Sequence, residues 1–277
     1  MSTAPAWDVN LLASRILDVY ERLRAAPDLA PSPALNALFA DLVSACTGAD
    51  AADTAAVLAD PRVDAVRDEL IRLCAQGESL LESAWARQAL ATGSVAAFPY
   101  LENYEQLARL ELHALAGAGH RPEATRRLCF IGGGPLPLSS ILLHRALGVP
   151  VTVVDRDREA VELSRLVVDR IAPARQISVV SADATSSSDL ARIVADCDVV
   201  VLAALVGTTR EQKQAALRAI GATVQPGTHV VIRSADGLRA LLYPTVDLDD
   251  VQDAGLVPQL LVHPLGEVVN SVLVTRR

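Results

Sequence analysis

The stretch "CFIGGGPLPLSS" (residues 129–140) decides which fold the sequence predicts. It joins an apolar strand end to three glycines, two prolines separated by one residue, and two serines. A glycine-rich turn between a strand and a helix is typical of nucleotide sites, because glycine allows a tight turn and close backbone approach. However, Pro137 stands where a dinucleotide fingerprint has its third glycine. Pro135 and Pro137 have no N–H to donate to a pyrophosphate, so the loop favours a nucleoside without phosphate groups.

Two aspartates extend this interpretation, because each comes at the end of a predicted strand. Asp155 ends the second strand, where a carboxylate commonly accepts both ribose hydroxyls. Asp183, in "ADA" (182–184), closes the third strand, where an aspartate can meet an adenine amino group. For the loop alone, a turn that only ends a strand beside a helix-capping Asp155 is an alternative. The loop and both aspartates together indicate a nucleoside site at the carboxyl edge of a sheet.

Short β-branched runs alternate with helical stretches from residue 126 onward, which predicts an α/β fold with a parallel sheet. The predicted strands are 128–131, 151–154, 177–181, 198–204 and 229–233, and the predicted helices lie near 137–147, 159–171, 188–195 and 210–222. Two final apolar runs, 257–263 and 269–275, predict a closing hairpin. Five parallel units and a hairpin suit the Rossmann-like class I S-adenosylmethionine-dependent transferase fold better than a dehydrogenase fold.

The residues before this part have almost no β-branched runs and are rich in Ala, Leu, Arg and Glu. Helices are predicted at about 8–25, 33–47, 63–85 and 102–117. The third follows a start signal at Asp60 and Pro61, and "GAGHRP" (117–122) predicts a linker. We therefore expect an N-terminal all-helical bundle or lid at residues 1–122 and a Rossmann-like S-adenosylmethionine-binding domain at residues 123–277.

Composition excludes several classes of protein. Of 277 residues, 51% are hydrophobic and 3% aromatic, and no apolar run approaches the roughly 20 residues of a membrane span. The net charge is −8 without a Lys/Arg cluster, which argues against a nucleic-acid partner. The four cysteines are far apart and form no CxxC pair, so no metal or disulfide set is expected. Together with the lack of a secretory signal, these features predict a cytoplasmic protein without a membrane partner.

A more specific pattern is carried by six segments in a fixed order. They are "LIRLCAQGESLLES" (70–83), "FPYLENYEQLARLE" (98–111), "GGGPLPLSSILL" (132–143), "LAALVG" (202–207), "RSADGLRALLYPTVD" (233–247) and "HPLGEVVNSVLVTRR" (263–277). These segments resemble the nicotianamine synthase family. The resemblance implies transfer of the 3-amino-3-carboxypropyl group of S-adenosylmethionine to an amine, with release of 5′-methylthioadenosine. S-adenosylmethionine would be a co-substrate, and no metal would take part.

The acceptor stays open at this point. A nicotianamine-type product, made by repeated transfer and azetidine closure, ranks first. A single transfer to histidine for an opine-type metallophore, and cyclisation of S-adenosylmethionine to azetidine-2-carboxylate, are the alternatives within the family. An ordinary methyltransferase or a non-catalytic binding module ranks lower. Asp236 and Leu101 replace the histidine and the aromatic residue usual in plant enzymes, so the acceptor and the number of transfers are in doubt. The expected partner is a small-molecule amine or amino acid, and a homodimer is left open.

Glu78 is the candidate catalytic base. On a helical wheel it lies at the edge of the apolar stripe that includes Leu70 and Trp85, and a carboxylate beside apolar surface has a raised pKa. Glu82 falls further round the wheel and is expected to face solvent. The resemblance implies that Tyr104 works with Glu78, by a hydrogen bond or by steering the substrate. Both residue types suit an alkyl transfer that needs an uncharged amine.

The remaining site residues fall into two groups. Those expected to hold S-adenosylmethionine are Gly132, Gly133, Gly134, Pro135, Leu136, Pro137, Ser139, Asp155, Asp183, Ala184, Ala203 and Leu205. Those expected to bind the other substrate are Phe98, Tyr100, Arg233 and Tyr243. Arg233 and Tyr243 are suited to a substrate carboxylate, although a plain salt bridge is almost as good an interpretation of Arg233. Asn270 is expected to close the sheet, and His263 to be structural.

Overall fold

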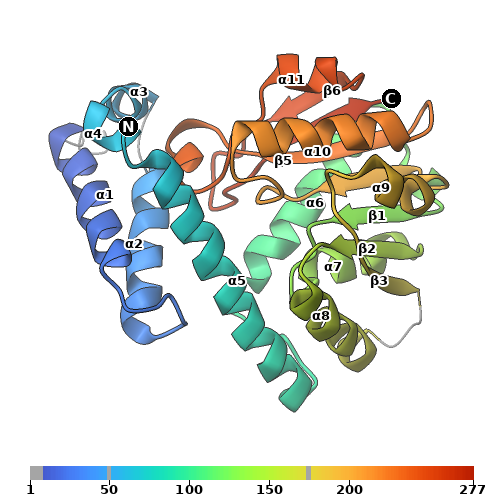
Figure 1. The fold of residues 1–277 in the computed structure, drawn as a ribbon, viewed down its shortest axis with the longest axis horizontal. Helices are drawn as coiled ribbons and strands as arrows, with labels where there is room; N and C mark the ends of the chain where they lie inside the picture. Colours follow the sequence, from blue (N-terminus) through green and yellow to red (C-terminus); the bar gives the residue numbers. More distant parts are fainter. Residues whose placement is uncertain (1–8, 49–50, 173–175) are drawn as a thin grey trace, which may run out of the picture.

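The computed structural model describes residues 9–48, 51–172 and 176–277 (Figure 1). Figure 1 shows a sheet with helices on both faces, and a separate group of N-terminal helices beside it. The strands are β1 (Leu128–Ile131), β2 (Val151–Asp155), β3 (Ile177–Ser181), β4 (Val199–Leu202), β5 (His229–Ser234), β6 (Val257–Val262) and β7 (Ser271–Arg276). Every predicted strand is therefore present.

The strands form one sheet in the order β3-β2-β1-β4-β5-β7-β6. β1 to β5 pair in parallel, and β7 pairs antiparallel with both β5 and β6. The predicted α/β sheet with its closing hairpin is confirmed. β4 ends two residues earlier than predicted, because the chain turns where the Val206 N–H donates to the Ala203 carbonyl (3.3 Å). Because β1 lies between β2 and β4, the loops after β1 and β4 border the crevice where such sheets bind ligands.

Helices cover both faces of the sheet. Those of the α/β part are α7 (Leu138–Leu147), α8 (Arg158–Ile171), α9 (Ser187–Val194), α10 (Arg210–Thr223) and α11 (Leu248–Asp253). Side chains alternate between the faces of β1: Phe130 packs in one core with α7 and α8, and Ile131 in a second with α9, α10 and α11. The core is aliphatic, as the composition requires.

The N-terminal part differs from the prediction in two respects. Its helices are α1 (Val9–Arg24), α2 (Pro33–Gly48), α3 (Ala51–Leu58), α4 (Pro61–Asp64), α5 (Arg67–Thr92) and α6 (Leu101–Gly117). Asp60 caps the one-turn helix α4 by accepting from Arg62 N, so α5 begins only at Arg67. It ends at Thr92 and is capped by Gly93, whose φ is +72°. α3 was not expected, because its Ala-rich sequence has no strong start signal. The first predicted residue, 8, lies outside the described residues.

Helices α5 and α6 connect the two parts of the chain. Leu107, Ala108 and Leu115 of α6 belong to the same core as Phe130 of β1, so α6 packs on the sheet. α5 runs between the N-terminal helices and the α/β part (Figure 1) and packs along α8. The proposed division at residues 122 and 123 stays a prediction.

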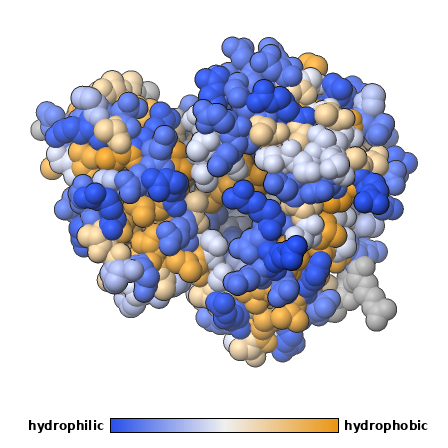
Figure 2. Space-filling model, viewed as in Figure 1, coloured by the Kyte–Doolittle hydropathy of each residue, from blue (hydrophilic) through white to orange (hydrophobic). Residues whose placement is uncertain are grey.

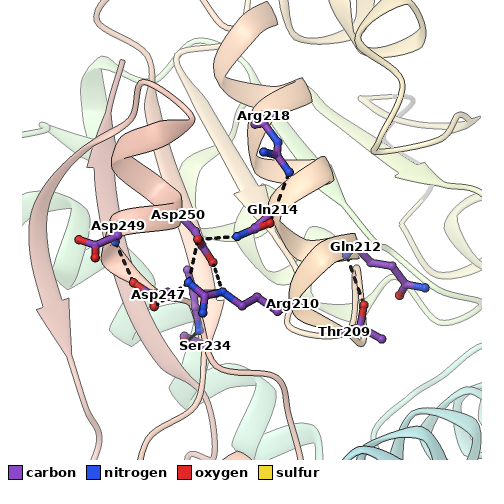
Figure 3. A network of polar contacts seen from close by, with 10 residues as sticks. Thr209, Arg210, Gln212, Gln214, Arg218, Ser234, Asp247, Asp249 and Asp250 are labelled. Carbon is purple, nitrogen blue, oxygen red and sulfur yellow. Dashed lines mark hydrogen bonds and ion pairs between the residues drawn. The ribbon is translucent and has the colours of Figure 1, made fainter.

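A polar network fixes the chain that follows β5 (Figure 3). Arg210, at the start of α10, donates from Nε to Asp250 (2.9 Å) and from Nη2 to Asp247 (3.1 Å), while Gln214 Nε2 donates to Asp250 (2.6 Å). Ser234 Oγ at the end of β5 accepts from Val246 N (2.9 Å). These contacts hold α11 against α10 and fix the segment that carries Tyr243. None of the described helices has the length and apolar character needed to cross a membrane.

Candidate active site

The loop after β1 is shaped by three glycines. Gly132 and Gly134 have φ values of +89° and +62°, which favour glycine. A Cβ at Gly132 or Gly133 would collide with Val206 or Val153, and one at Gly134 would lie 2.5 Å from Glu82 Oε2. The loop therefore takes its path between neighbours that leave no room for side chains.

The backbone donors of this loop are already bonded within the protein. Gly132 N and Gly133 N donate to the Val154 carbonyl (2.7 and 3.2 Å), and Gly134 N donates to Asp155 Oδ2 (2.8 Å). Pro135 and Pro137 have no backbone N–H to donate. A pyrophosphate would find few free donors here and two nearby carboxylates, Asp155 and Glu82. The loop thus fits a phosphate-free nucleoside, as the sequence predicts.

A cavity of about 350 Å³ opens at this loop. All residues predicted to hold S-adenosylmethionine line it, including Asp155, Asp183 and Ala184 at the ends of β2 and β3. The backbone N–H and hydroxyl of Thr185 donate to Asp183 Oδ1 (2.8 Å each), and these bonds lower the pKa of Asp183. Its carboxylate is therefore held ionised. We call this space the donor cavity.

A second cavity, of about 560 Å³, lies beside the N-terminal helices. Phe98, Tyr100 and Tyr243 line it, whereas Arg233 lines the donor cavity; their predicted role in binding the second substrate stays a prediction. Phe39 of α2 contributes part of its apolar wall. Figure 2 shows a hollow in the surface between the N-terminal helices and the α/β part. We call this second space the acceptor cavity.

Four side chains line both cavities: Glu78, Glu82, Tyr104 and Tyr243. Glu78 and Glu82 lie one turn apart on α5 and so share a face of the helix. Tyr243 OH donates to Glu78 Oε2 (2.7 Å), and Tyr104 OH donates to Glu82 Oε1 (2.8 Å). Of the two roles predicted for Tyr104, a hydrogen bond to Glu78 is not formed, because each tyrosine pairs with a different glutamate. Steering of the substrate by Tyr104 stays a prediction.

The prediction that Glu82 faces solvent is wrong. Its carboxylate is half-buried, bonded to Tyr104 and in contact with Gly134. A helical wheel places a residue relative to one apolar stripe of its own helix. It could not show that the β1 loop and α6 cover the adjacent side of α5.

Burial controls the electrostatics of these four groups. It raises the pKa of Glu78, against the opposing effects of the Tyr243 hydrogen bond and the Arg233 charge. Burial and then the charge of Glu78 raise the pKa of Glu82 well above its ordinary value. The pKa values of Tyr104 and Tyr243 are also raised, mainly by burial, so both remain hydroxyl donors. Carboxylates whose pKa is raised by burial can accept a proton near neutral pH.

Arg233 forms an ion pair within the protein, which was one of the two roles that the sequence suggested for it. Its Nε and Nη2 donate to Glu111 Oε1 (2.7 Å) and Oε2 (3.2 Å), and Nη2 also donates to Ser139 Oγ (3.0 Å). The guanidinium lies over the Phe130 ring, 5.0 Å from its centroid. Glu111 was not singled out from the sequence. The sequence did contain a signal for it, because Glu111 lies four residues from both Leu107 and Leu115 and so shares the buried face of α6 with these apolar residues.

The other singled-out residues lie around the site. His263 Nδ1 is 2.9 Å from Ser271 Oγ, which suits a structural role. Asp236 is exposed, whereas Leu101 is half-buried. Asn270 is buried and lines the donor cavity. Among the residues that the structure describes, no three His, Cys, Asp or Glu side chains are grouped to hold a metal ion.

The family model described as nicotianamine synthase protein matches residues 6–277. The chain belongs to the nicotianamine synthase family. Nicotianamine synthase 3 of Oryza sativa subsp. indica is 37% identical, and the match covers 97% of this chain and 79% of that protein. Probable nicotianamine synthase 2 of Hordeum vulgare is 36% identical, with 98% and 81% covered. The resemblance drawn from the six sequence segments is thereby confirmed.

Solved structures of nicotianamine synthases have the same fold. The crystal structure of MtNAS in complex with MTA and tNA matches with a TM-score of 0.78 and 26% identity, over 100% of this chain and 99% of that one. The structure of an MtNAS mutant in complex with S-adenosylmethionine matches with a TM-score of 0.79 and 24% identity, over 96% and 97% of the two chains. The predicted combination of a class I sheet with N-terminal helices is confirmed.

Proposed function

We propose that this member of the nicotianamine synthase family transfers the 3-amino-3-carboxypropyl group of S-adenosylmethionine to an amine and releases 5′-methylthioadenosine. One observation carries the proposal: Glu78, bonded to Tyr243, lies where the donor and acceptor cavities meet. A base in that position can take a proton from an amine that approaches from the acceptor cavity toward a carbon held in the donor cavity. The names of the relatives and the ligands of the MtNAS crystal structures support the same donor and reaction.

The donor cavity suits S-adenosylmethionine on chemical grounds. The Gly-Pro loop excludes phosphate, Asp155 is available to the ribose hydroxyls, and Asp183 to the adenine amino group. Glu82 and Glu78 also line this cavity. Their carboxylates favour the positive sulfonium and ammonium groups of this donor. Glu82 Oε2 lies close to the backbone of Gly134, so this carboxylate is beside the β1 loop.

The reaction is a substitution at the γ-carbon. The lone pair of an uncharged acceptor amine forms the new N–C bond, while the bond between the γ-carbon and sulfur breaks. Its electron pair stays on the sulfur of 5′-methylthioadenosine. The proton lost by the acceptor nitrogen goes to Glu78, whose raised pKa makes it a suitable base. Tyr243 orients the Glu78 carboxylate, and Tyr104 holds that of Glu82.

We propose a nicotianamine-type product first, a single transfer to histidine second, and azetidine-2-carboxylate third. Incubation of the enzyme with S-adenosylmethionine alone, followed by mass spectrometry, separates them. Nicotianamine together with 5′-methylthioadenosine supports the first. A product formed only when histidine is added supports the second, and azetidine-2-carboxylate as the only amino-acid product supports the third. E78Q serves as the control and should give no product. Formation of S-adenosylhomocysteine instead would refute the proposal.

We also make proposals about the partners of the enzyme, its location and the arrangement of its domains. Net acidity and the lack of a basic cluster support an enzyme that acts on small molecules and binds no nucleic acid. A cytoplasmic location stays a prediction. We propose that residues 1–122 act as a helical lid over residues 123–277, since both groups contribute to the acceptor cavity. Assembly as a homodimer stays a prediction.

A further inference from the structure

One buried amide in the donor cavity has no explained role. Asn270 immediately precedes β7, and only 8% of its surface is exposed. Its Nδ2 has no hydrogen-bond partner among the described residues, yet the side chain lines the donor cavity. Buried polar groups in proteins nearly always have a partner, so an exception at a cavity wall indicates that a ligand provides it. The sheet-closing role expected from the sequence does not account for this geometry.

Arg233 presents a second free donor to the same cavity. Its Nε and Nη2 are bonded to Glu111 and Ser139, but its Nη1 donates to no described residue. Arg233 pairs with Val272 across β5 and β7, and Asn270 lies two residues before Val272. Side chains two apart along an extended chain project on the same face, so Arg233 and Asn270 are neighbours on the α6 face of the sheet.

The same cavity is lined by several carboxylates and by a further cation, Arg156, which directly follows Asp155 at the nucleoside end. Glu78 and Glu82 suit the ammonium and sulfonium groups of the donor, while Asp155 and Asp183 suit its nucleoside. The donor has one anionic group, the α-carboxylate of its amino-acid end. We propose that Asn270 Nδ2 and Arg233 Nη1 together bind this carboxylate. The assignment rests on the proposed function and adds the subsite that holds the transferred group.

The subsite would decide which carbon reacts. Anchoring the carboxylate at one end and the adenosine at the other stretches the three-carbon chain across the junction with the acceptor cavity. The γ-carbon then faces Glu78, and the methyl group has no comparable alignment. A neutral amide suits this position, because a further cation beside Arg233 would be repelled and costly to bury. Glu111 keeps the guanidinium edge fixed while Nη1 stays available.

The test compares two ligands that differ by the transferred group. Isothermal titration calorimetry measures the affinities of S-adenosylmethionine and 5′-methylthioadenosine for wild type, N270A and N270D. Loss of a hydrogen bond to a charged group should weaken S-adenosylmethionine binding by about tenfold in N270A. The added negative charge should weaken it further in N270D. Binding of 5′-methylthioadenosine, which has no carboxylate, should change less than about twofold. Q259A removes an exposed amide of β6 that lines neither cavity, and this variant should bind both ligands like wild type.

Several outcomes would overturn the proposal. Equal losses for both ligands in N270A would indicate a structural role, and unchanged S-adenosylmethionine binding would show that the amide binds no carboxylate. If the variants fail to fold, wild type is titrated with decarboxylated S-adenosylmethionine, whose affinity should be at least about tenfold lower. Equal affinities would refute the subsite. Because these are binding measurements, they are independent of turnover, and only a lack of 5′-methylthioadenosine formation by wild type bears on the proposed function.

Discussion

Glu78 and Glu82 have similar sequence surroundings but different tasks. Both are half-buried beside a tyrosine at the junction of the cavities, and each raises the pKa of groups around it. Glu78 bonds Tyr243 from the segment after β5, whereas Glu82 bonds Tyr104 from α6 and touches the β1 loop. Separate partners allow one carboxylate to take a proton while the other faces the donor. At this scale, burial raises the pKa values of both carboxylates, and the tyrosine hydrogen bonds oppose that rise.

The first prediction concerns the pH dependence of turnover. Glu78 must be ionised to act as a base, so activity should fall as pH decreases through its raised pKa. The Tyr243 hydrogen bond lowers that pKa, so its removal in Y243F should shift the acid limb of kcat/KM to higher pH. Rates of 5′-methylthioadenosine formation between pH 5 and about 9 measure the shift. An unchanged acid limb in Y243F would show that Glu78 does not govern it.

The second prediction concerns stability and Glu82. Its folded-state pKa is raised, so its contribution to stability is fully present below the unfolded-state pKa and is lost as pH rises through the folded-state value. In E82Q the side chain cannot ionise, so the loss of stability with rising pH does not occur at this position. The Tm of E82Q should therefore exceed that of wild type by a margin that grows as pH rises from about 5 to 8. A margin independent of pH, measured by calorimetry without ligand, would contradict the raised pKa.

At the scale of single elements, the β1 loop does most to define the donor cavity. Its glycines fit between Val206, Val153 and Glu82, and its N–H groups are bonded to β2. The sequence already indicated this element, because glycines and prolines impose local geometry that does not depend on the rest of the chain. The strands were predictable for a similar reason, since their β-branched runs are fully buried in a parallel sheet.

The third prediction uses two glycines with similar backbone conformations. Gly134 (φ +62°) touches Glu82, whereas Gly148 (φ +69°) has nothing near its would-be Cβ. G148A should cost only the strain of a left-handed alanine, about 1–2 kcal/mol. G134A carries the same strain and also displaces Glu82, so it should in addition weaken binding of S-adenosylmethionine. Denaturant titration and calorimetry on both variants test this. Equal affinities for the donor would show that the contact with Glu82 is irrelevant.

Contacts between side chains of different elements could not be predicted from the sequence. The pairing of Glu111 with Arg233 joins residues from α6 and β5, and the bond from Tyr243 to Glu78 joins a loop to α5. No local pattern specifies which of several glutamates meets a given tyrosine. For the same reason the wheel misplaced Glu82, because its partner lies on a helix that packs from the other side. Propensity and periodicity describe single elements, whereas these pairs depend on tertiary packing.

At the scale of the whole molecule, two parts of the chain supply two cavities. The α/β part provides a nucleoside site of the kind found at the carboxyl edge of parallel sheets, and the N-terminal helices enclose the space beside it. α5 passes between the parts and places both carboxylates at the boundary, while α6 packs on the sheet and supplies Tyr104. This arrangement accounts for a transferase that directs its acceptor to the γ-carbon instead of the methyl group.

The most direct measurement follows a ¹³C label in the methyl group of S-adenosylmethionine during turnover. If the γ-carbon is attacked, the label stays on sulfur and appears in 5′-methylthioadenosine, while the amine product contains none. E78Q keeps the β1 loop, Asp155 and Asp183 of the donor cavity, so it should bind the labelled donor but release no labelled product. Mass spectrometry of both product fractions gives the answer. Label in the amine product, together with S-adenosylhomocysteine, would contradict the account.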